Sequence, residues 1–250
     1  MGDYVPEERS IISALKPVFS PSSSPETPAV QSLIKALNLI EHLEGGYFVQ
    51  TDRDETTIPS PYPPEPLSGR TVNLAGHKDG FDPKLRRLST TIFYYLTPQR
   101  PQGSFHRNRS RIIHTLHRGR GRYVLIHPSG RIETFVVGQN VEKGEKLQWV
   151  VEGGTYKASF LLPETDGKDS GGLLISEVVV PGFEFDDHEF LSKAGARELL
   201  PEKHAQELDW LVREDDDEED EEGTQDEKTA SLNGVGGNSQ HQHQHQHQRL

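Results

Sequence analysis

The side chains best suited to chemistry gather between residues 100 and 122. This segment holds ten arginine or histidine residues and no acidic one: Arg100, His106, Arg107, Arg109, Arg111, His114, His117, Arg118, Arg120 and Arg122. Polar and apolar residues alternate over 111–118, so a strand there would put His114 on the opposite face from Arg111 and His117. Imidazole and guanidinium groups inside a closed pocket would bind an anionic or hydrogen-bonding small molecule. The alternative is a basic outer surface that pairs with acids such as Glu133, Glu142 and Glu184.

The segments around this cluster predict strands. Short runs rich in Val, Ile, Phe, Tyr and Thr follow one another at 47–53, 89–99, 111–118, 123–127, 131–137, 147–151, 156–162 and 173–180. Gly, Pro and Ser separate most of these runs, and no long amphipathic helix interrupts the series from 89 to 162. This pattern favours an all-β sandwich or barrel over a parallel α/β sheet. A register slip of one residue would reverse every side chain of a strand, so periodicity alone leaves the inward face of each strand open.

Helices are predicted on both sides of the β region. Apolar spacing indicates a short helix within residues 4–16, another at 29–42, and a helical segment at 194–212 that restarts at Pro201. We therefore divide the chain into an N-terminal helix and linker, a barrel, C-terminal helices, and a disordered acidic and His/Gln-rich tail, at 1–28, 29–192, 193–213 and 214–250. Residues 54–87, rich in Pro, Gly and charge, would form an arm or lid, or else a mobile surface loop.

Composition excludes several classes of function. The net charge is −12, but residues 214–227 hold eleven acidic residues and no basic one, so the rest of the chain is nearly neutral. The charge therefore gives no indication of nucleic-acid binding. The chain has no cysteine, which excludes a disulfide, a thiolate metal site and a cysteine nucleophile. No apolar run reaches ~18 residues and no secretory pattern opens the chain, so we expect a cytoplasmic protein without a membrane span.

Four short motifs occur in order along the chain. They are EGGYF at 44–48, FHR at 105–107, QWVVEGG at 148–154 and VPGFEF at 180–185. Together they resemble the cupin-5 family, a branch of the RmlC-like cupins formerly listed as a domain of unknown function, and the sequence is most similar to its uncharacterised fungal members. The resemblance covers roughly residues 30–191. It implies a double-stranded β-helix (jelly-roll) barrel, usually dimeric, with a ligand pocket inside.

The sequence departs from the ligand pattern of metal-binding cupins, which is a His-x-His…Glu motif and a later His. Asn108 stands at the second His of that motif, and Lys157 falls near the later His. Protonated lysine repels a cation, and no carboxylate is evident beside His106 and His114. We therefore expect no bound metal and no other cofactor, with a metal-dependent site as the alternative.

A cupin site without metal can still be catalytic, because the sugar-nucleotide epimerases of the RmlC-like group resemble such a case. Their chemistry needs a His base, a cation that holds the oxyanion and a Tyr that returns a proton. The predicted catalytic residues are accordingly His106, Lys157 and Tyr47, and the predicted ligand-binding residues are Arg111, His114, Tyr156 and Glu177. Within this set Arg111 is an alternative oxyanion holder and Tyr156 an alternative acid. Glu177 would orient His106, or pair with a barrel arginine.

Three functions remain open on this basis. The first is a barrel that binds a small polar or anionic metabolite and acts as an isomerase or epimerase without metal. The second is a metal-dependent cupin enzyme, such as a dioxygenase or metalloisomerase. The third is a non-catalytic binding or assembly module with the acidic tail as an interaction arm. We expect a homodimer with a small-molecule ligand and with neither nucleic acid nor membrane as a partner.

Overall fold

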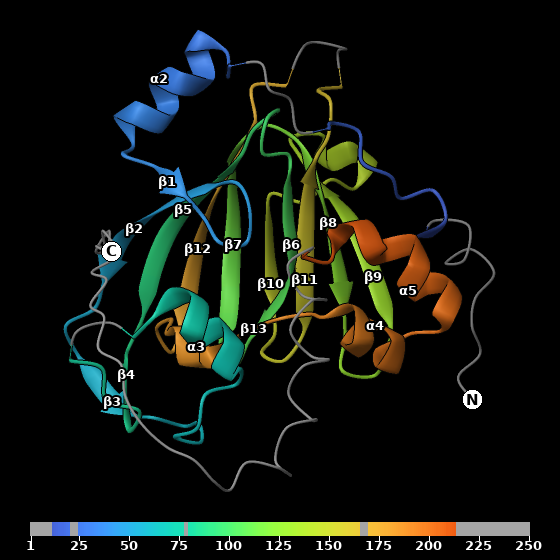
Figure 1. Cartoon of the computed structure of the whole chain (residues 1–250). Coiled ribbons are helices and arrows are strands. Elements are labelled where there is room, and N and C mark those ends of the chain that lie inside the picture. Colours follow the sequence, from blue (N-terminus) through green and yellow to red (C-terminus); the bar gives the residue numbers. More distant parts are fainter. Residues whose placement is uncertain (1–11, 21–24, 78–79, 166–169, 214–250) are drawn as a thin grey trace, which may run out of the picture.

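The computed structural model describes residues 12–20, 25–77, 80–165 and 170–213. Two antiparallel sheets form the body of the molecule (Figure 1). One sheet has six strands in the order β1 (Ile40–Glu41), β2 (Tyr47–Arg53), β5 (Thr90–Leu96), β12 (Leu173–Val180), β7 (Arg111–Arg118) and β10 (Gln148–Val151). The other has five strands in the order β13 (His188–Phe190), β6 (Gln102–Asn108), β11 (Tyr156–Leu161), β8 (Gly121–Ile126) and β9 (Ile132–Val137). The predicted all-β jelly-roll architecture is confirmed.

Three apolar clusters hold these layers together. The interior cluster lies between the two sheets and includes Leu116, Tyr123, Trp149, Leu161 and Ile175. A second cluster packs the outer face of the five-stranded sheet against the C-terminal helices, and a third packs the outer face of the six-stranded sheet against an N-terminal helix. Apolar residues are thus buried on the outer faces of both sheets as well as between them.

The helices are shorter than predicted. The N-terminal helix α2 (Pro28–Ala36) starts after Thr27, whose Oγ1 accepts a hydrogen bond from the Val30 amide at 3.4 Å. It ends before the predicted residue 42 because Asn38 adopts a positive φ of 54° and the chain turns into β1. The C-terminal segment divides at Pro201 as predicted, into α4 (Lys193–Leu199) and α5 (Glu202–Leu208), followed by the 3-10 turn η3 (Asp209–Leu211).

Residues 54–87, called the arm below, carry secondary structure of their own. A two-stranded sheet of β3 (Thr57–Pro59) and β4 (Leu85–Arg87) flanks helix α3 (Gly69–Ala75). Helix α3 packs against β13 and the 3-10 turn η2 (Phe185–Asp187) that precedes it (Figure 1). The arm interpretation therefore describes this segment better than a loose loop. A further 3-10 turn, η1 (Val141–Lys143), precedes β10.

Two of the predicted segments lie largely or wholly outside the described residues. These are the helix within residues 4–16, of which only the last part is described, and the tail at 214–250. Within the described ranges, no helix is long and apolar enough to cross a membrane.

Candidate functional site

Two pairs of polar side chains face each other between the sheets. Lys157 on β11 is in register with His106 on β6, in the five-stranded sheet. Glu177 on β12 is in register with His114 on β7, in the six-stranded sheet. All four side chains are buried. The structure thus brings together four of the predicted site residues from four separate strands.

Lys157 connects the two sheets. Its Nζ donates hydrogen bonds to Glu177 Oε2 at 2.8 Å and to His114 Nε2 at 3.0 Å. Because an ammonium group only donates, His114 Nε2 accepts and the ring proton lies on Nδ1. Burial and the charge of Lys157 lower the pKa of His114 well below 6.5, which keeps this imidazole neutral. Glu177 therefore pairs with Lys157, and the alternative of a barrel arginine as its partner was wrong.

A second group of polar side chains, which was not predicted from the sequence, adjoins this one. Glu44 Oε1 lies 3.2 Å from His106 Nε2 and 3.1 Å from His188 Nε2. The rings of His106 and His188 stack with centroids 5.2 Å apart. On the other side, His42 Nδ1 lies 3.5 Å from Glu44 Oε2. The expectation that no carboxylate lies beside His106 was therefore wrong.

A tight turn before β2 brings Glu44 to this position. Glu44 O accepts a hydrogen bond from the Ser104 amide at 2.7 Å, which docks the turn on β6. The next residue, Gly45, has a φ of 107°, and a Cβ there would lie 2.2 Å from Gln102 O. Only glycine fits both the conformation and the space. This is the physical reason for glycine after Glu44 in the EGGYF motif, and the motif was the available signal for this carboxylate.

The hydrogen bonds of His106 fix its tautomer. Its Nδ1 lies 2.8 Å from Ser104 O, and since a carbonyl only accepts, Nδ1 carries the proton. His106 Nε2 therefore presents a lone pair, and within the described part of the chain it has no hydrogen-bond partner. Burial lowers the pKa of His106 to about 3, against the opposing attraction of Glu44. Burial raises the pKa of Glu44, but His106, His42 and His188 together bring it well below 4.5, so this carboxyl is ionised at neutral pH.

Glu44, His106 and His188 form a donor set that suits a divalent metal. One ligand atom from each lies within 4.8 Å of the other two. Histidine nitrogens and carboxylate oxygens bind Zn²⁺ at about 2.0–2.2 Å, so donors at right angles around an ion stand about 3 Å apart. Sets of two His and one carboxylate hold Zn²⁺ or Fe²⁺ with coordination positions left open. The lone pair of His106 that faces Glu44 without a proton between them is what an ion at this point would satisfy.

A small cavity separates the two groups. It is lined by Glu44, Tyr94, His106, Tyr123, Lys157, Ala158, Ser159 and Glu177. Its volume is about 10 Å³. That is room for one water molecule or ion. The Tyr94 hydroxyl has no hydrogen-bond partner among the described residues. A larger ligand therefore requires the lining side chains to move. A wider groove of about 630 Å³ lies at the surface beside α2, away from this chemistry.

Three predicted site residues lie outside the interior. Tyr47 lines the groove beside α2 and packs under the Arg100 guanidinium, 5.4 Å from the ring centroid. Arg111 is exposed and its Nε donates to Glu152 at 3.0 Å. The Tyr156 hydroxyl donates to Glu189 at 2.9 Å, on the side of the C-terminal helices.

The basic cluster at 100–122 also has members inside and outside the space between the sheets. Its arginines do not line the cavity, and most of them pair with acids that do not line it either, as in Arg107–Glu189, Arg109–Asp187 and Arg120–Glu145. His106 and His114 alone turn inward from it to the site. The pocket interpretation holds for these two histidines and the surface interpretation for the arginines.

The class of protein follows from this architecture. Jelly-roll sandwiches of two antiparallel sheets include the cupins, and this one encloses His, Glu and Lys side chains. The chain matches the family model described as Cupin superfamily (DUF985), Cupin_5, over residues 31–191, and it belongs to this family. The resemblance drawn from the four motifs is confirmed.

Known relatives agree with this assignment. The chain is 46% identical over 190 residues to the uncharacterized protein YML079W of Saccharomyces cerevisiae, covering 75% of this chain and 89% of the relative. A hypothetical protein from Leishmania major has a similar structure, with a TM-score of 0.59, 26% identity, and coverage of 74% of this chain and 98% of the other. Protein SO0799 from Shewanella oneidensis gives a TM-score of 0.55 at 25% identity, over 76% and 99% of the two chains.

Proposed function

We propose that this protein is a cupin that binds a divalent metal ion at Glu44, His106 and His188 and acts with it on a small polar or anionic metabolite. One observation carries the proposal. The Nε2 lone pair of His106, fixed by the bond of Nδ1 to Ser104 O, faces the Glu44 carboxylate at 3.2 Å without a hydrogen bond. A lone pair and a carboxylate repel each other at this distance. An ion coordinated by both groups would replace this repulsion with two coordination bonds. The proposal favours the metal-dependent alternative over the metal-free one.

The residues across the cavity have roles of their own in this proposal. A divalent ion would supply a Lewis acid that stabilises negative charge developing on a ligand oxygen. Lys157 lies on the same cavity and would orient an anionic group, with Glu177 and His114 holding its ammonium in place. Burial raises the pKa of Tyr94 and Tyr123 well above 10, so both phenols stay protonated as hydrogen-bond donors. The closed interior would exclude bulk water from the reacting groups.

Metal analysis of the full chain tests this proposal. The four tail histidines, His241, His243, His245 and His247, are changed to Gln so that the tail contributes no metal. After incubation with Zn²⁺ or Mn²⁺ and dialysis, we expect about one ion per chain. In the same background, Glu44→Gln should lower metal affinity by more than about tenfold, while the matched change Glu177→Gln, which removes the neighbouring carboxylate, should retain the ion. Equal, substoichiometric metal in the parent and in Glu44→Gln would reject the proposal.

The metal-independent isomerase remains the second candidate. It is favoured by Lys157, a fixed cation at the place of the later His of metal cupins, with His106 beside it as a neutral base. Ligand binding or turnover that persists in chelator-treated protein and is lost in His106→Ala would select this function over the first.

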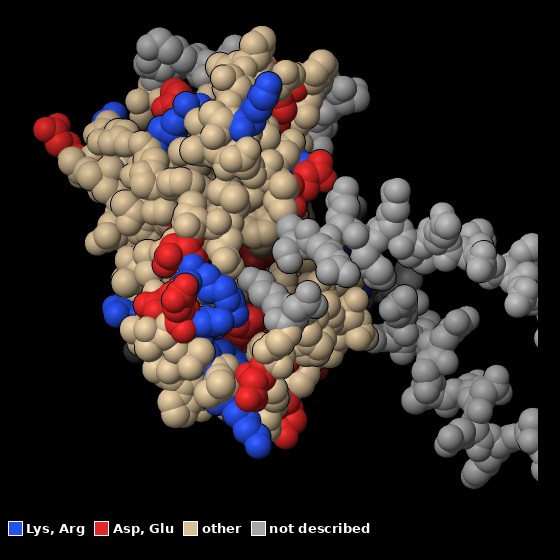
Figure 2. All heavy atoms as spheres, turned by 90° about the vertical axis from the view of Figure 1, so that its left-hand side faces the viewer, with Lys and Arg blue, Asp and Glu red and all other residues tan. Residues whose placement is uncertain are grey.

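We also propose a second copy of this chain as the partner. Beyond the part covered by α2, the outer face of the six-stranded sheet carries the uncharged, partly buried side chains of Ile113 and Val178, with Val49 and Phe93 at the margin of the α2 cluster. Figure 2 views the molecule from the side of β2 and β5 and shows a broad area without charged side chains. In a two-fold dimer the same patch meets itself, so a face without like charges is suited to that contact.

A further inference from the structure

The acidic residues before His188 are each held by a basic side chain. Arg53, at the end of β2, forms an ion pair with Glu184. His77 Nδ1 lies 3.1 Å from Asp186 Oδ2, and Arg86 binds Asp187. His77 and Arg86 both belong to the arm, which also binds this segment through its backbone, because Leu67 N donates to Asp186 O at 2.7 Å. The arm therefore binds the segment that leads into His188 through both side chains and backbone.

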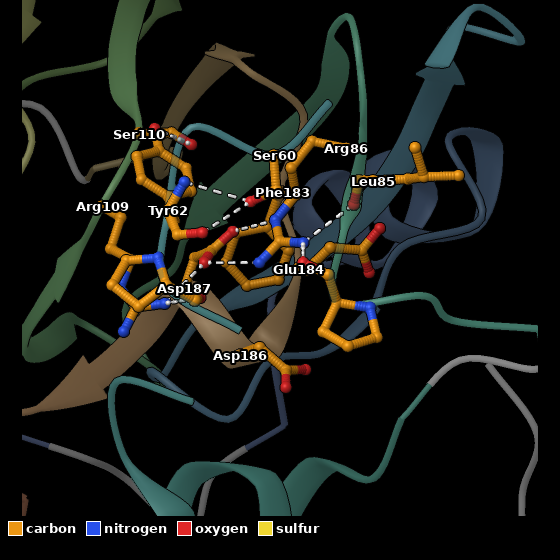
Figure 3. Close-up of polar contacts among 12 residues, drawn as sticks. Ser60, Tyr62, Leu85, Arg86, Arg109, Ser110, Phe183, Glu184, Asp186 and Asp187 are labelled. Carbon is orange, nitrogen blue, oxygen red and sulfur yellow. Dashed lines mark hydrogen bonds and ion pairs between the residues drawn. The ribbon is translucent and has the colours of Figure 1, made fainter. Parts of the chain in front are cut away.

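Arg86 makes the most rigid of these contacts. Its side chain is fully buried, and its Nε and Nη2 donate to Asp187 Oδ2 and Oδ1 at 2.6 and 3.0 Å (Figure 3). Its Nη1 donates to Pro83 O and Leu85 O at 3.0 and 2.8 Å, which fixes the guanidinium to its own arm. A two-point Arg–carboxylate bond defines orientation as well as distance. Asp187 is thus held in one position relative to the arm.

Asp187 is also held by Arg109, directly before His188 in the chain. Asp187 O accepts a hydrogen bond from Arg109 N at 2.9 Å, and Arg109 Nη1 lies 3.3 Å from Asp187 Oδ1. The backbone is extended at His188, with φ −116° and ψ 146°. His188 is the first residue of β13 and lies opposite Asn108 of β6, and residues opposite each other in an antiparallel pair share a face. The His188 ring, directly after the anchored Asp187, points inward, where its Nε2 lies 3.1 Å from Glu44 Oε1.

We propose that Arg86 is a positioning residue for the metal site: its clamp on Asp187 holds the His188 imidazole beside Glu44 and His106, and so couples the docking of the arm to metal binding. This inference rests on the proposed function. A buried ion pair adds little net stability compared with apolar residues of the same size, so stability alone does not explain a fully buried Arg–Asp pair. A fixed geometry one residue before a metal ligand does explain it.

Metal affinity in arm variants tests the coupling. Arg86→Met places an unbranched apolar side chain near the rings of Tyr62 and Phe81, over which the guanidinium lies, but loses the charge and every donor to Asp187. Outer residues that orient metal ligands affect affinity by about 10–100-fold, so we expect the Kd for Zn²⁺ to rise about tenfold or more. Arg86→Lys, which keeps the charge, should recover part of the loss. The matched control is Arg120→Met, which breaks a 2.7 Å bond to Glu145 outside both arm and site and should leave the Kd unchanged.

A measurement on the metal-free protein distinguishes a failure of this inference from a failure of the proposed function on which it rests. In the metal-free parent, nitrogen NMR of the imidazoles should show His188 donating through Nε2 to Glu44, and Arg86→Met should lose this bond while circular dichroism shows a folded protein. If the parent binds no metal but the variant still loses the bond, the positioning role stands and the metal proposal fails. If folded Arg86→Met keeps both the parent Kd and the His188 signal, Arg86 does not position His188, and the metal proposal survives when Glu44→Gln still weakens binding.

Discussion

Lys157 determines how the interior charges are balanced. It bonds to Glu177 and His114 of the opposite sheet while its strand neighbour His106 bonds to Ser104. Removal of one member of a buried ion pair leaves an uncompensated charge, which costs far more than removal of both. The stability of the two-sheet core should therefore depend on the pair as a unit.

A double-mutant cycle measures this dependence. Lys157→Met alone should lower the free energy of unfolding by about 3–5 kcal/mol, because Glu177 is left buried without its cation. The double change Lys157→Met/Glu177→Gln should cost less than the sum of the two single changes, with a coupling energy of about 1–3 kcal/mol. Urea denaturation of the four proteins gives the cycle. Strictly additive losses would show that the two charges act independently.

His114 makes stability depend on pH. Burial and the charge of Lys157 lower its pKa well below 6.5, with Glu177 Oε1 3.5 Å away as the facing acid. The unfolded chain takes up this proton first, so the stabilisation is complete above about pH 6.5 and is lost as the pH falls below it, by up to about 1.4 kcal/mol per pH unit. Between pH 7 and 5, His114→Gln should show a smaller slope of unfolding free energy than wild type. Equal slopes in His114→Gln and the wild type would show that this imidazole does not contribute to the pH dependence.

At the scale of elements, the turn that carries Glu44 is the tightest constraint on the site. Gly45 has no room for a Cβ against Gln102 O, whereas Gly144, with a φ of 81°, has open space around it. A side chain at either glycine strains the backbone by about 1–2 kcal/mol. Only Gly45→Ala also pushes the turn off β6 and so displaces Glu44.

A comparison of Gly45→Ala with Gly144→Ala therefore distinguishes backbone strain from displacement of Glu44. We expect Gly144→Ala to cost about 1 kcal/mol of unfolding free energy and to leave metal affinity intact. We expect Gly45→Ala to cost more than this and to reduce metal binding about as much as Glu44→Gln does. Calorimetric titration with Zn²⁺ and thermal unfolding report the two effects. Wild-type affinity in Gly45→Ala would mean that the turn relaxes without moving the carboxylate.

The elements also show what the sequence could and could not predict. Strands β7 and β12 have the predicted bounds because β-branched runs and Gly/Pro punctuation define them locally. Strand β6 was not predicted, since Gln102, Gly103 and Ser104 have weak strand propensity and tertiary pairing with β11 and β13 holds them extended. His188 and Glu44 meet across 144 positions of sequence, so periodicity cannot bring them together.

At the scale of the whole molecule, the proposed role of Arg86 couples the arm to the proposed metal site. If the docked arm favours metal binding through Arg86, then bound metal must favour the docked arm by the same free energy. Saturating Zn²⁺ should therefore slow amide hydrogen exchange in β3 and β4, as measured by mass spectrometry. The protection should be absent in Glu44→Gln. Slower exchange in that variant as well would assign the effect to metal bound elsewhere.

The uncharged outer face of the six-stranded sheet gives the last prediction. Without a partner it would leave Ile113, Val178 and their neighbours partly exposed to solvent, so we expect a dimer of twice the 28.1 kDa chain mass by light scattering. Val178→Lys puts like charges opposite each other in a two-fold contact and should yield monomer. Val141→Lys, at a residue 55% exposed on η1, should remain dimeric. A wild-type monomer would exclude the dimer, and a dimer that persists in Val178→Lys would move the contact to another face.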